Sequence, residues 1–282
     1  MNLKAIIRLH FILQVLSAEI IAGAIISYWA ISAFFRCPGI PAITPVLAIC
    51  IWIVYAGDRV LDNTNKNIPT KRHHFYRRFK VPILVISVVL ALLAGLCLFQ
   101  IPSHILWIGT ALTLLISLYF LLLLYFKIWY KELFAAVLYS SGVLLAPLSS
   151  LPHSFHFFHL IFALQFFAIV MVNLLIFSWY DRENDQVSRQ ISIILYLGEH
   201  TSRILIYALL YISFTVVLVS MAWYPETNNK VMQFCLFLMN AMLFLIFKFQ
   251  KFFHKNEIYR SIGDGIFVLP VIYLIYERVS GI

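Results

Sequence analysis

The stretch that decides the fold is Trp179-Tyr180-Asp181-Arg182-Glu183-Asn184-Asp185. It ends an apolar run from Leu160 to Phe177 that is long enough to cross a bilayer. If the helix continues through these polar residues, Asp181 and Asp185 lie one turn apart on the same helix face. The stretch therefore predicts a membrane span that carries a polar, acidic site at one of its ends.

A second acidic pair has the same spacing and the same kind of position. Asp58 and Asp62 follow another apolar run, from Val46 to Tyr55, and an arginine comes directly after the first aspartate, as it does after Asp181. Each half of the chain thus contains a span that ends in Asp-Arg-x-x-Asp. This is a weak internal echo of the kind that duplicated membrane folds show.

The composition indicates a polytopic membrane protein. The chain has 282 residues, of which 62% are hydrophobic and only 12% charged, whereas a soluble domain carries about one quarter charged residues. The first apolar run, from about residue 11 to 35, has full span length, so we interpret it as a retained helix and not as a signal peptide. The four cysteines contain no Cys-x-x-Cys motif, which favours packing roles over a disulfide or metal site.

Apolar runs divide the chain into about nine spans and leave no soluble domain, so we predict one all-α membrane bundle over residues 1–282. Glycine or proline breaks, which are typical of transporters, are expected only at Gly142 and Pro147. The predicted spans are 11–35, 42–58, 81–100, 104–126, 132–151, 157–180, 203–223, 231–248 and 262–276.

The basic residues are distributed very unevenly between the two ends of these spans. With the N-terminus inside, 18 of the 21 lysines and arginines fall on the inner side and only Arg36, Lys230 and Arg278 on the outer side. By the positive-inside rule this predicts a cytoplasmic N-terminus and cytoplasmic aspartate motifs, in the inner membrane if the cell is bacterial. The net charge of +9 is explained by topology, and no basic and aromatic stripe on a soluble face points to nucleic acid.

The four aspartates are the candidate metal ligands and catalytic residues. Carboxylates at two helix ends would repel one another in a partly apolar setting unless a cation held them together. Mg²⁺ prefers oxygen ligands and is commonly held by one or two carboxylates plus phosphate oxygens. Ordinary interfacial charge is the alternative interpretation. The candidates are Asp58, Asp62, Asp181 and Asp185.

Several basic residues near these pairs could hold a diphosphate. The predicted loop from Asn63 to Lys80 is long and basic, and it is either a topology signal or a lid over an anionic group. Lys127 and Lys131, where the fourth predicted span meets the fifth, are either a diphosphate-binding pair or snorkelling lysines. The candidate diphosphate ligands are Arg59, Lys71, Arg72, Lys127, Lys131 and Arg182.

Two further features lie near the predicted inner surface. The segment from Asp185 to Thr201 contains an apolar patch, Ile191 to Leu197, and predicts a short amphipathic segment over the membrane face. Asp264, between Gly263 and Gly265, opens the last predicted span. We expect the helix dipole to stabilise this carboxylate at a helix N-terminus.

These residues, in this order, resemble the UbiA superfamily of intramembrane prenyltransferases. That family has an aspartate motif after the second span, a basic stretch between the fourth and fifth, and a second aspartate motif after the sixth, followed by Ser and Gly. The resemblance covers nearly the whole chain. The matching positions are Asp58, Asp62, Lys127, Lys131, Asp181, Asp185, Ser192 and Gly198.

The chain departs from the family pattern at several positions. Val54 and Tyr55 replace the Asn and first Asp of motif one, Ile191 replaces the Lys before the Ser, and Arg72-His73 replaces the Arg-Pro that often follows motif one. The resemblance implies Mg²⁺-dependent transfer of a polyprenyl group from its diphosphate to a small, possibly aromatic acceptor within the bilayer. The departures favour an alternative, a transporter or isoprenoid-binding protein on the same fold without chemistry.

Overall fold

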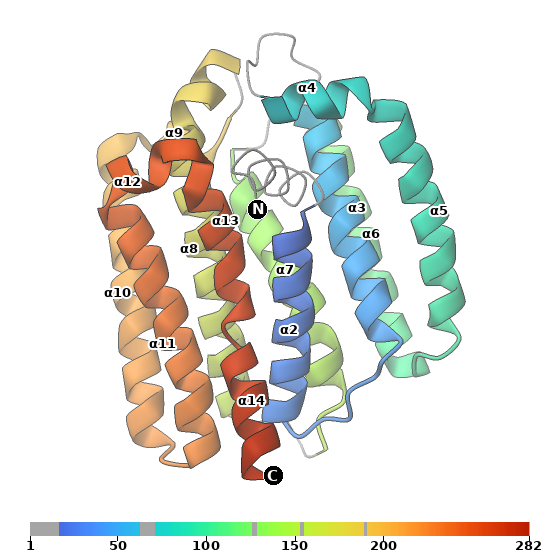
Figure 1. The fold of residues 1–282 in the computed structure, drawn as a ribbon, viewed down its shortest axis with the longest axis vertical. Helices are drawn as coiled ribbons and strands as arrows, with labels where there is room; N and C mark the ends of the chain where they lie inside the picture. The colour runs from blue at the N-terminus through green and yellow to red at the C-terminus, as the bar shows by residue number, and fades with distance from the viewer. Residues whose placement is uncertain (1–16, 63–70, 126–128, 153–154, 189–190, 282) are drawn as a thin grey trace, which may run out of the picture.

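The computed structural model describes residues 17–62, 71–125, 129–152, 155–188 and 191–281, and within them every regular element is helical (Figure 1). Side chains are also left undescribed at 61–62, 71–74, 123–124, 188 and 256. Helices are the expected elements, because a chain in lipid must satisfy its backbone hydrogen bonds within each span.

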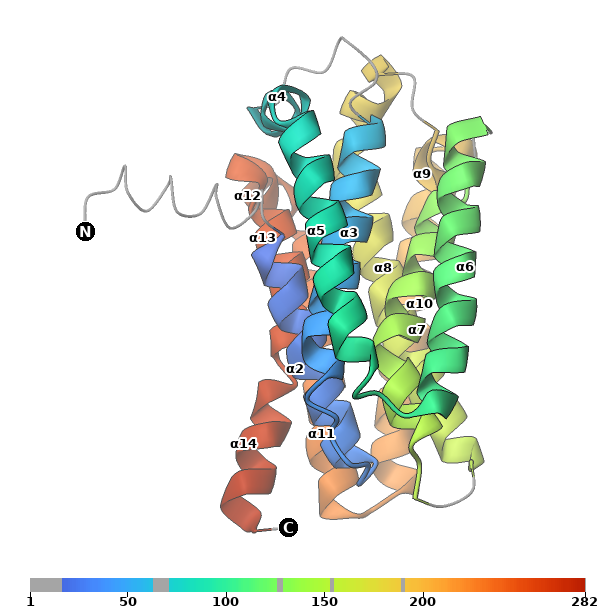
Figure 2. The same cartoon turned by 90° about the vertical axis from the view of Figure 1, so that its right-hand side faces the viewer.

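The long helices alternate in direction and stand side by side (Figures 1 and 2). The first part of the chain forms α2 (Ala18–Phe34), α3 (Ile43–Asp62), α4 (Lys71–Arg78), α5 (Lys80–Leu98) and α6 (Ser103–Tyr125). The second part forms α7 (Lys131–Ser149), α8 (Phe157–Ser188), α9 (Ile193–Leu197), α10 (Glu199–Trp223), α11 (Thr227–Lys248), α12 (Gln250–His254), α13 (Ile258–Gly265) and α14 (Val271–Ser280).

Nine of these segments match the nine predicted spans. Eight are long and apolar enough to cross a membrane, with α13 and α14 together counted as the last, and α2 adds a shorter apolar helix within the described residues. The prediction of an all-α, multi-pass membrane bundle is therefore confirmed. The cause is local, since a run of about twenty apolar residues is enough to specify a span.

Three local features differ from the sequence-based expectation. The segment 63–80 was expected to be a loop, but its second part folds as α4. Gly142 and Pro147 are the only candidate helix breaks that the sequence offers, and α7 continues through both. The interruption lies instead in the last span, where a 3-10 segment at Ile266–Val268 separates α13 from α14.

A close contact with α2 accounts for the position of this interruption. Gly23 of α2 packs against Phe267 so closely that a Cβ atom on Gly23 would lie 2.6 Å from the Phe267 Cβ. The Ser27 hydroxyl of α2 donates a hydrogen bond to the Phe267 carbonyl at 3.0 Å. A carbonyl in the interrupted stretch thereby finds its partner on the neighbouring helix, as buried backbone in a membrane requires.

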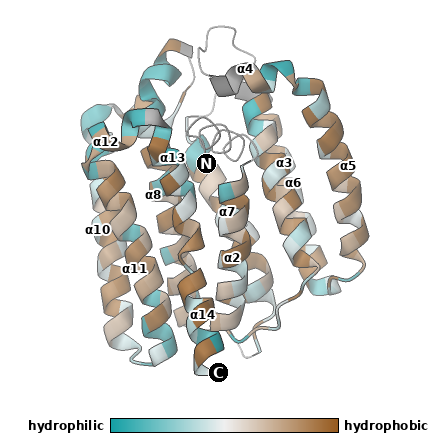
Figure 3. Ribbon diagram, viewed as in Figure 1, coloured by the Kyte–Doolittle hydropathy of each residue, from teal (hydrophilic) through white to brown (hydrophobic). Residues whose placement is uncertain are grey.

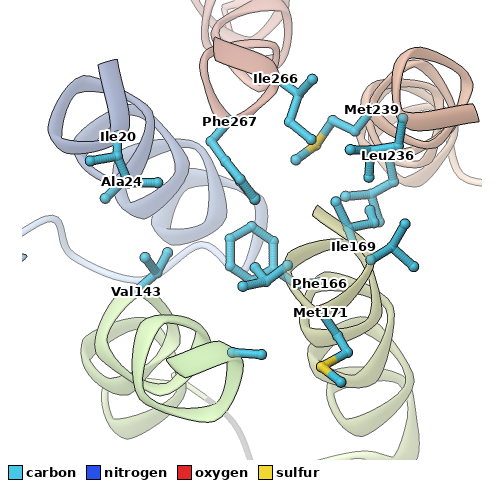
Figure 4. Packing of buried hydrophobic residues seen from close by; sticks show 14 of the residues in the cluster. Ile20, Ala24, Val143, Phe166, Ile169, Met171, Leu236, Met239, Ile266 and Phe267 are labelled. Atoms are coloured by element: carbon cyan, nitrogen blue, oxygen red, sulfur yellow. The ribbon is translucent and has the colours of Figure 1, made fainter. Parts of the chain in front are cut away.

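The core lies where α2, α7, α8, α11 and the interrupted last span meet. Figure 4 shows Phe166 of α8 and Phe267 pointing toward each other, with Val143 of α7 and Leu236 of α11 around them. The ring centroids of Phe166 and Phe267 are 6.0 Å apart in an edge-to-face arrangement, which is a favoured aromatic geometry. Helix α8 is the most buried span of the bundle and is central to it.

Helices α5 and α6 form the opposite case, because they are the least buried of the spans. Leu92, Trp107 and Leu114 on these helices are among the large exposed apolar side chains. An apolar surface of this extent is compatible with lipid and not with water. Hydrophilic residues gather instead at the end of the bundle formed by α4, α12 and the end of α8 (Figure 3).

Candidate active site at the polar end of the bundle

Helix α8 carries the second acidic pair to the polar end of the bundle. It continues from Phe157 without interruption to Ser188, so Asp181 and Asp185 are indeed one turn apart on one helix. Asp58 lies in the last turns of α3, whose end is at the same side of the bundle (Figure 1). The bundle therefore brings the two acidic helix ends to the same membrane surface.

Asp181 is the centre of a charged cluster built with residues from α13 and the turn before it. The Tyr259 hydroxyl donates to Asp181 Oδ1 at 2.8 Å, and Arg260 forms an ion pair with Asp181 Oδ2. The Arg260 Nε also lies 3.6 Å from Glu257 Oε2. We call Asp181, Glu257, Tyr259 and Arg260 the acid cluster. The Asp181 and Arg260 side chains are 22% and 16% exposed, so water and polar ligands can reach this pair.

Packing holds the acid cluster in place. The rings of Tyr180 and Tyr259 stack with centroids 4.2 Å apart and planes 9° from parallel. The Tyr180 hydroxyl donates to the Ile246 carbonyl of α11 at 2.7 Å. The Asp181 carboxylate is thus fixed from two sides, by its own helix and by α13, which is the preorganisation that a binding site needs.

Helix α3 approaches the acid cluster through Tyr55. The side chain of Tyr55 lies within electrostatic range of Arg260 and Asp264 of α13, as well as of Asp58 and Arg59 on its own helix. The Arg59 guanidinium lies over the Tyr55 ring, 5.4 Å from its centroid. Tyr55 of α3 therefore lies in the electrostatic field of the acid cluster.

Polar atoms continue from the cluster into the bundle. Among the described residues, the Tyr139 hydroxyl and Asn173 Oδ1 are buried and make no hydrogen bond. Such atoms are uncommon and call for a partner. A Cβ on Gly263 would lie 2.6 Å from Asn173 Oδ1, so glycine leaves room there for that amide.

Asp264 does not occupy the position predicted from sequence. It is the seventh of the eight residues of α13 and is buried, so it lies away from the N-terminus of that helix. The expectation of dipole stabilisation at a helix N-terminus is therefore wrong. From the apolar run, the span was predicted to begin at residue 262. The helix begins earlier, at Ile258, because Asp181 binds Tyr259 and Arg260 in its first turn.

The connection between α8 and α10 contains the predicted short apolar segment as α9. The Ser192 hydroxyl caps α9 by accepting from the Leu195 N–H at 3.3 Å, and Gly198 has a φ of 77° between α9 and α10. Glycine tolerates this positive φ at little cost. Ser192 and Gly198 thus have local structural roles in setting the turn over the polar end.

A buried carboxylate ties this connection to α7. Glu132, in the first turn of α7, is buried and accepts a hydrogen bond from the Ile193 N–H at 3.3 Å. The Trp129 and Tyr196 rings stack nearby with centroids 4.3 Å apart. These contacts place α9 beside Lys131, the described member of the predicted lysine pair.

The other predicted ligands are placed as follows. Arg182 donates to the Trp179 carbonyl at 2.8 Å and lies over the Trp179 ring, so it contacts a different face of α8 from Asp181. Lys127 lies outside the described residues, as do the side chains of Asp62, Lys71 and Arg72. Among the side chains that are described, no three of the types His, Cys, Asp and Glu gather in a metal-binding group.

The residues present still fit a Mg²⁺ ion that arrives with a diphosphate. Carboxylate oxygens are the hard ligands that Mg²⁺ prefers, and the Asp181 side chain is 22% exposed at the polar end of the bundle. One or two carboxylates suffice when phosphate oxygens complete the coordination. Asp181 and Asp185 would be the first ligands, with Asp58 and Asp62 at the end of α3 on the same side of the bundle.

Sequence reasoning missed Tyr259 and Arg260 as site residues. Arg260 counted only as one of the inner basic residues, and the span was expected to begin after it. One signal was available, because Tyr-Arg-Ser-Ile-Gly-Asp-Gly joins an arginine to an acid within an apolar region. Charged residues inside a membrane segment are costly and pair with each other.

Comparison with known structures supports the fold. The chain is similar to the apo structure of a UbiA homolog from Aeropyrum pernix K1, with a TM-score of 0.65 and 13% sequence identity. The superposition covers 95% of this chain and 99% of that one. This chain has a UbiA-like fold. No protein-family model and no curated protein matches it in sequence.

Proposed function

We propose that the protein is a UbiA-type prenyltransferase that transfers a polyprenyl group from its diphosphate to a small, possibly aromatic acceptor. The observation that carries the proposal is the acid cluster, in which Tyr259 and Arg260 orient Asp181 at the polar end of a UbiA-like bundle. A diphosphate would bind at this end, and its apolar chain would extend between the helices. Both the polyprenyl diphosphate and the acceptor would reach the site from the bilayer.

In the proposed reaction the bond between the prenyl carbon and the diphosphate oxygen breaks, and the diphosphate leaves with the electron pair. The resulting allylic cation forms a bond with a nucleophilic atom of the acceptor, which then loses a proton to the released diphosphate. Mg²⁺ bound with the diphosphate would stabilise the leaving group's negative charge. Asp181 would position that ion, and Arg260 would keep the cluster from repelling an anionic substrate.

The basic residues of the polar end would assist in holding the diphosphate. Arg59 and Lys131 lie near helix ends there, and we assign the same role to Lys71, Arg72 and Lys127. Arg182 instead contacts Trp179 on another face of α8. Tyr55 and Tyr139, which line the interior near Asp264, would contact the prenyl chain or the acceptor through their rings. Aromatic faces stabilise a nearby cation, so these rings suit a site in which an allylic cation forms.

The deciding experiment is Mg²⁺-dependent binding of a prenyl diphosphate to the purified protein and to Asp181→Asn. The substitution keeps the shape of the side chain and removes its charge. We expect affinity and product formation to fall by roughly 100-fold, with the protein still folded. Glu183→Gln, an exposed acid two residues further along the same helix, is the matched control. Equal binding by wild type and Asp181→Asn, or wild-type binding without Mg²⁺, would refute the proposal.

A non-catalytic transporter or isoprenoid-binding protein is the second candidate. The interrupted last span favours it, because broken helices that expose polar groups near the membrane centre are typical of transporters. The two candidates differ in one measurement. Membranes that contain the protein form a prenylated product, detected by mass spectrometry, only if it is an enzyme.

The orientation of the bundle is part of the proposal. The basic ends of the described helices, with Arg59, Lys131 and Lys248 among them, lie at the polar end, and Arg278 lies at the other. We expect single cysteines introduced near Lys71 and Arg189 to react only with reagents applied from the cytoplasmic side. Labelling of either cysteine from outside in intact cells would contradict the proposed orientation.

A further inference from the structure

A second polar feature at the same end of the bundle lies apart from the acid cluster. Where α10, α11 and α12 meet, the surface is hollowed into an open cavity of about 550 Å³. Figure 1 shows these three helices together at one edge of the bundle. We call this cavity the basic pocket. Its lining includes Arg203, Lys248 and Lys251, and none of the residues that line it is acidic.

The basic pocket is both cationic and apolar. Phe249 and Phe252 line it and are exposed, at 52% and 67%. The ammonium of Lys248 lies 5.8 Å from the centroid of the Phe249 ring. Exposed phenylalanines beside lysines at the end of a membrane helix are typical of a segment that lies in the lipid headgroup region. Exposed phenylalanines are unfavourable on a surface that faces only water.

The wall of the pocket is attached to α8. Trp179, which is fully buried, donates from Nε1 to the Gln250 side chain at 3.2 Å, and Gln250 lines the pocket. The guanidinium of Arg203 lies 5.5 Å from the centroid of the Trp179 ring. The pocket is therefore preformed, and one cation is held on its wall by stacking.

One acid reduces the positive charge at the rim. Glu199 pairs with Arg203 at 3.0 Å in an exposed i,i+4 contact, and exposed pairs of this kind contribute little. Lys248 and Lys251 remain on the other wall of the pocket. Positive charge therefore exceeds negative charge here, and the apolar spans below the pocket face lipid.

We propose that the basic pocket binds the phosphate of an anionic glycerophospholipid from the bilayer. Basic pockets between membrane helices suit phosphate head groups, because lysines and an arginine attract the charge while the spans receive the acyl chains. The exposed Phe249 and Phe252 favour a lipid over free phosphate, since inorganic phosphate gains nothing from an apolar wall. This site does not depend on the prenyltransferase proposal.

The test uses native mass spectrometry of the full chain in a neutral detergent, titrated with phosphatidylglycerol or phosphatidylcholine. We expect wild type to bind phosphatidylglycerol in preference to phosphatidylcholine. Lys248→Gln with Lys251→Gln should weaken this binding by roughly 25-fold, about fivefold for each lysine. Lys248→Arg with Lys251→Arg keeps the charge and should retain binding, which excludes a folding defect as the cause.

A matched control places the same charge loss elsewhere. Arg77 of α4 and Lys80, the first residue of α5, are exposed at the polar end. Arg77→Gln with Lys80→Gln should leave binding of phosphatidylglycerol unchanged. Equal binding of both lipids by wild type, or an unchanged affinity in the double lysine-to-glutamine variant, would overturn the proposal. So would displacement of the bound lipid by an equal concentration of inorganic phosphate.

Discussion

Helix α8 contributes to two polar clusters that differ in burial and in charge. Toward its start, Gln165 exchanges hydrogen bonds with Gln233 of α11 at 3.0 and 3.1 Å and donates to Ser220 of α10 at 3.2 Å. We call these three residues the amide cluster, and all are at most 3% exposed. Toward its end, α8 contributes Asp181 to the acid cluster, which is charged and partly exposed.

The difference teaches how to separate a structural polar group from a functional one in a membrane bundle. The two glutamine amides bind each other reciprocally, so they join α8, α10 and α11 and offer no opening to a ligand. The acid cluster is charged and partly exposed, and it lies where the helices end. Saturated and buried polar groups stabilise association of helices, whereas charged, accessible ones at helix ends mark sites.

The largest effect that would sharpen this comparison is expected from Arg260. Arg260→Gln leaves Asp181 and Glu257 facing an anionic diphosphate without their cation, so affinity for a prenyl diphosphate should fall by roughly tenfold or more. Arg260→Lys should recover only part of it, because lysine restores the charge without the planar fork. The measurement is binding at fixed Mg²⁺. Full binding by Arg260→Gln would make this arginine purely structural.

A smaller effect is expected from Tyr259. Tyr259→Phe keeps the ring stacked on Tyr180 and removes the hydroxyl that donates to Asp181 at 2.8 Å. Loss of one such bond should weaken binding by about fivefold to tenfold. Tyr180→Phe is the control within the same ring pair, because its hydroxyl donates to Ile246 at 2.7 Å and not to the acid cluster. If both variants bind equally well, the Tyr259 hydroxyl has no part in the site.

The smallest effect is expected from the amide cluster, and it concerns stability alone. Gln233→Leu leaves the Gln165 amide without its reciprocal partner and should lower the free energy of unfolding by about 0.6–1.7 kcal/mol. Gln165→Leu with Gln233→Leu removes both amides and should restore most of that loss. Unfolding of the purified protein in detergent measures both. A change in prenyl diphosphate affinity in either variant would contradict the separation of the two clusters.

Much of the candidate site could be predicted from sequence because its parts are local. Spacing placed Asp181 and Asp185 on one helix face, and charge distribution placed Asp58 and the basic residues at the same end. The same reasoning failed for Asp264, since an apolar window marks where lipid-compatible residues begin and not where the helix begins. The helix starts earlier because a residue on another helix binds its first turn.

By itself the sequence determined the helical class, the number and approximate ends of the spans, and the two acidic pairs, because apolar length and helical period act over about twenty neighbouring residues. The tertiary structure alone decided that Arg260 pairs with Asp181, 79 residues away, that Gln165 meets Gln233, and that the last span is interrupted opposite Gly23. Each of these depends on which helices pack together. Packing is selected by the fit of many side chains at once, and no single stretch of the chain contains that information.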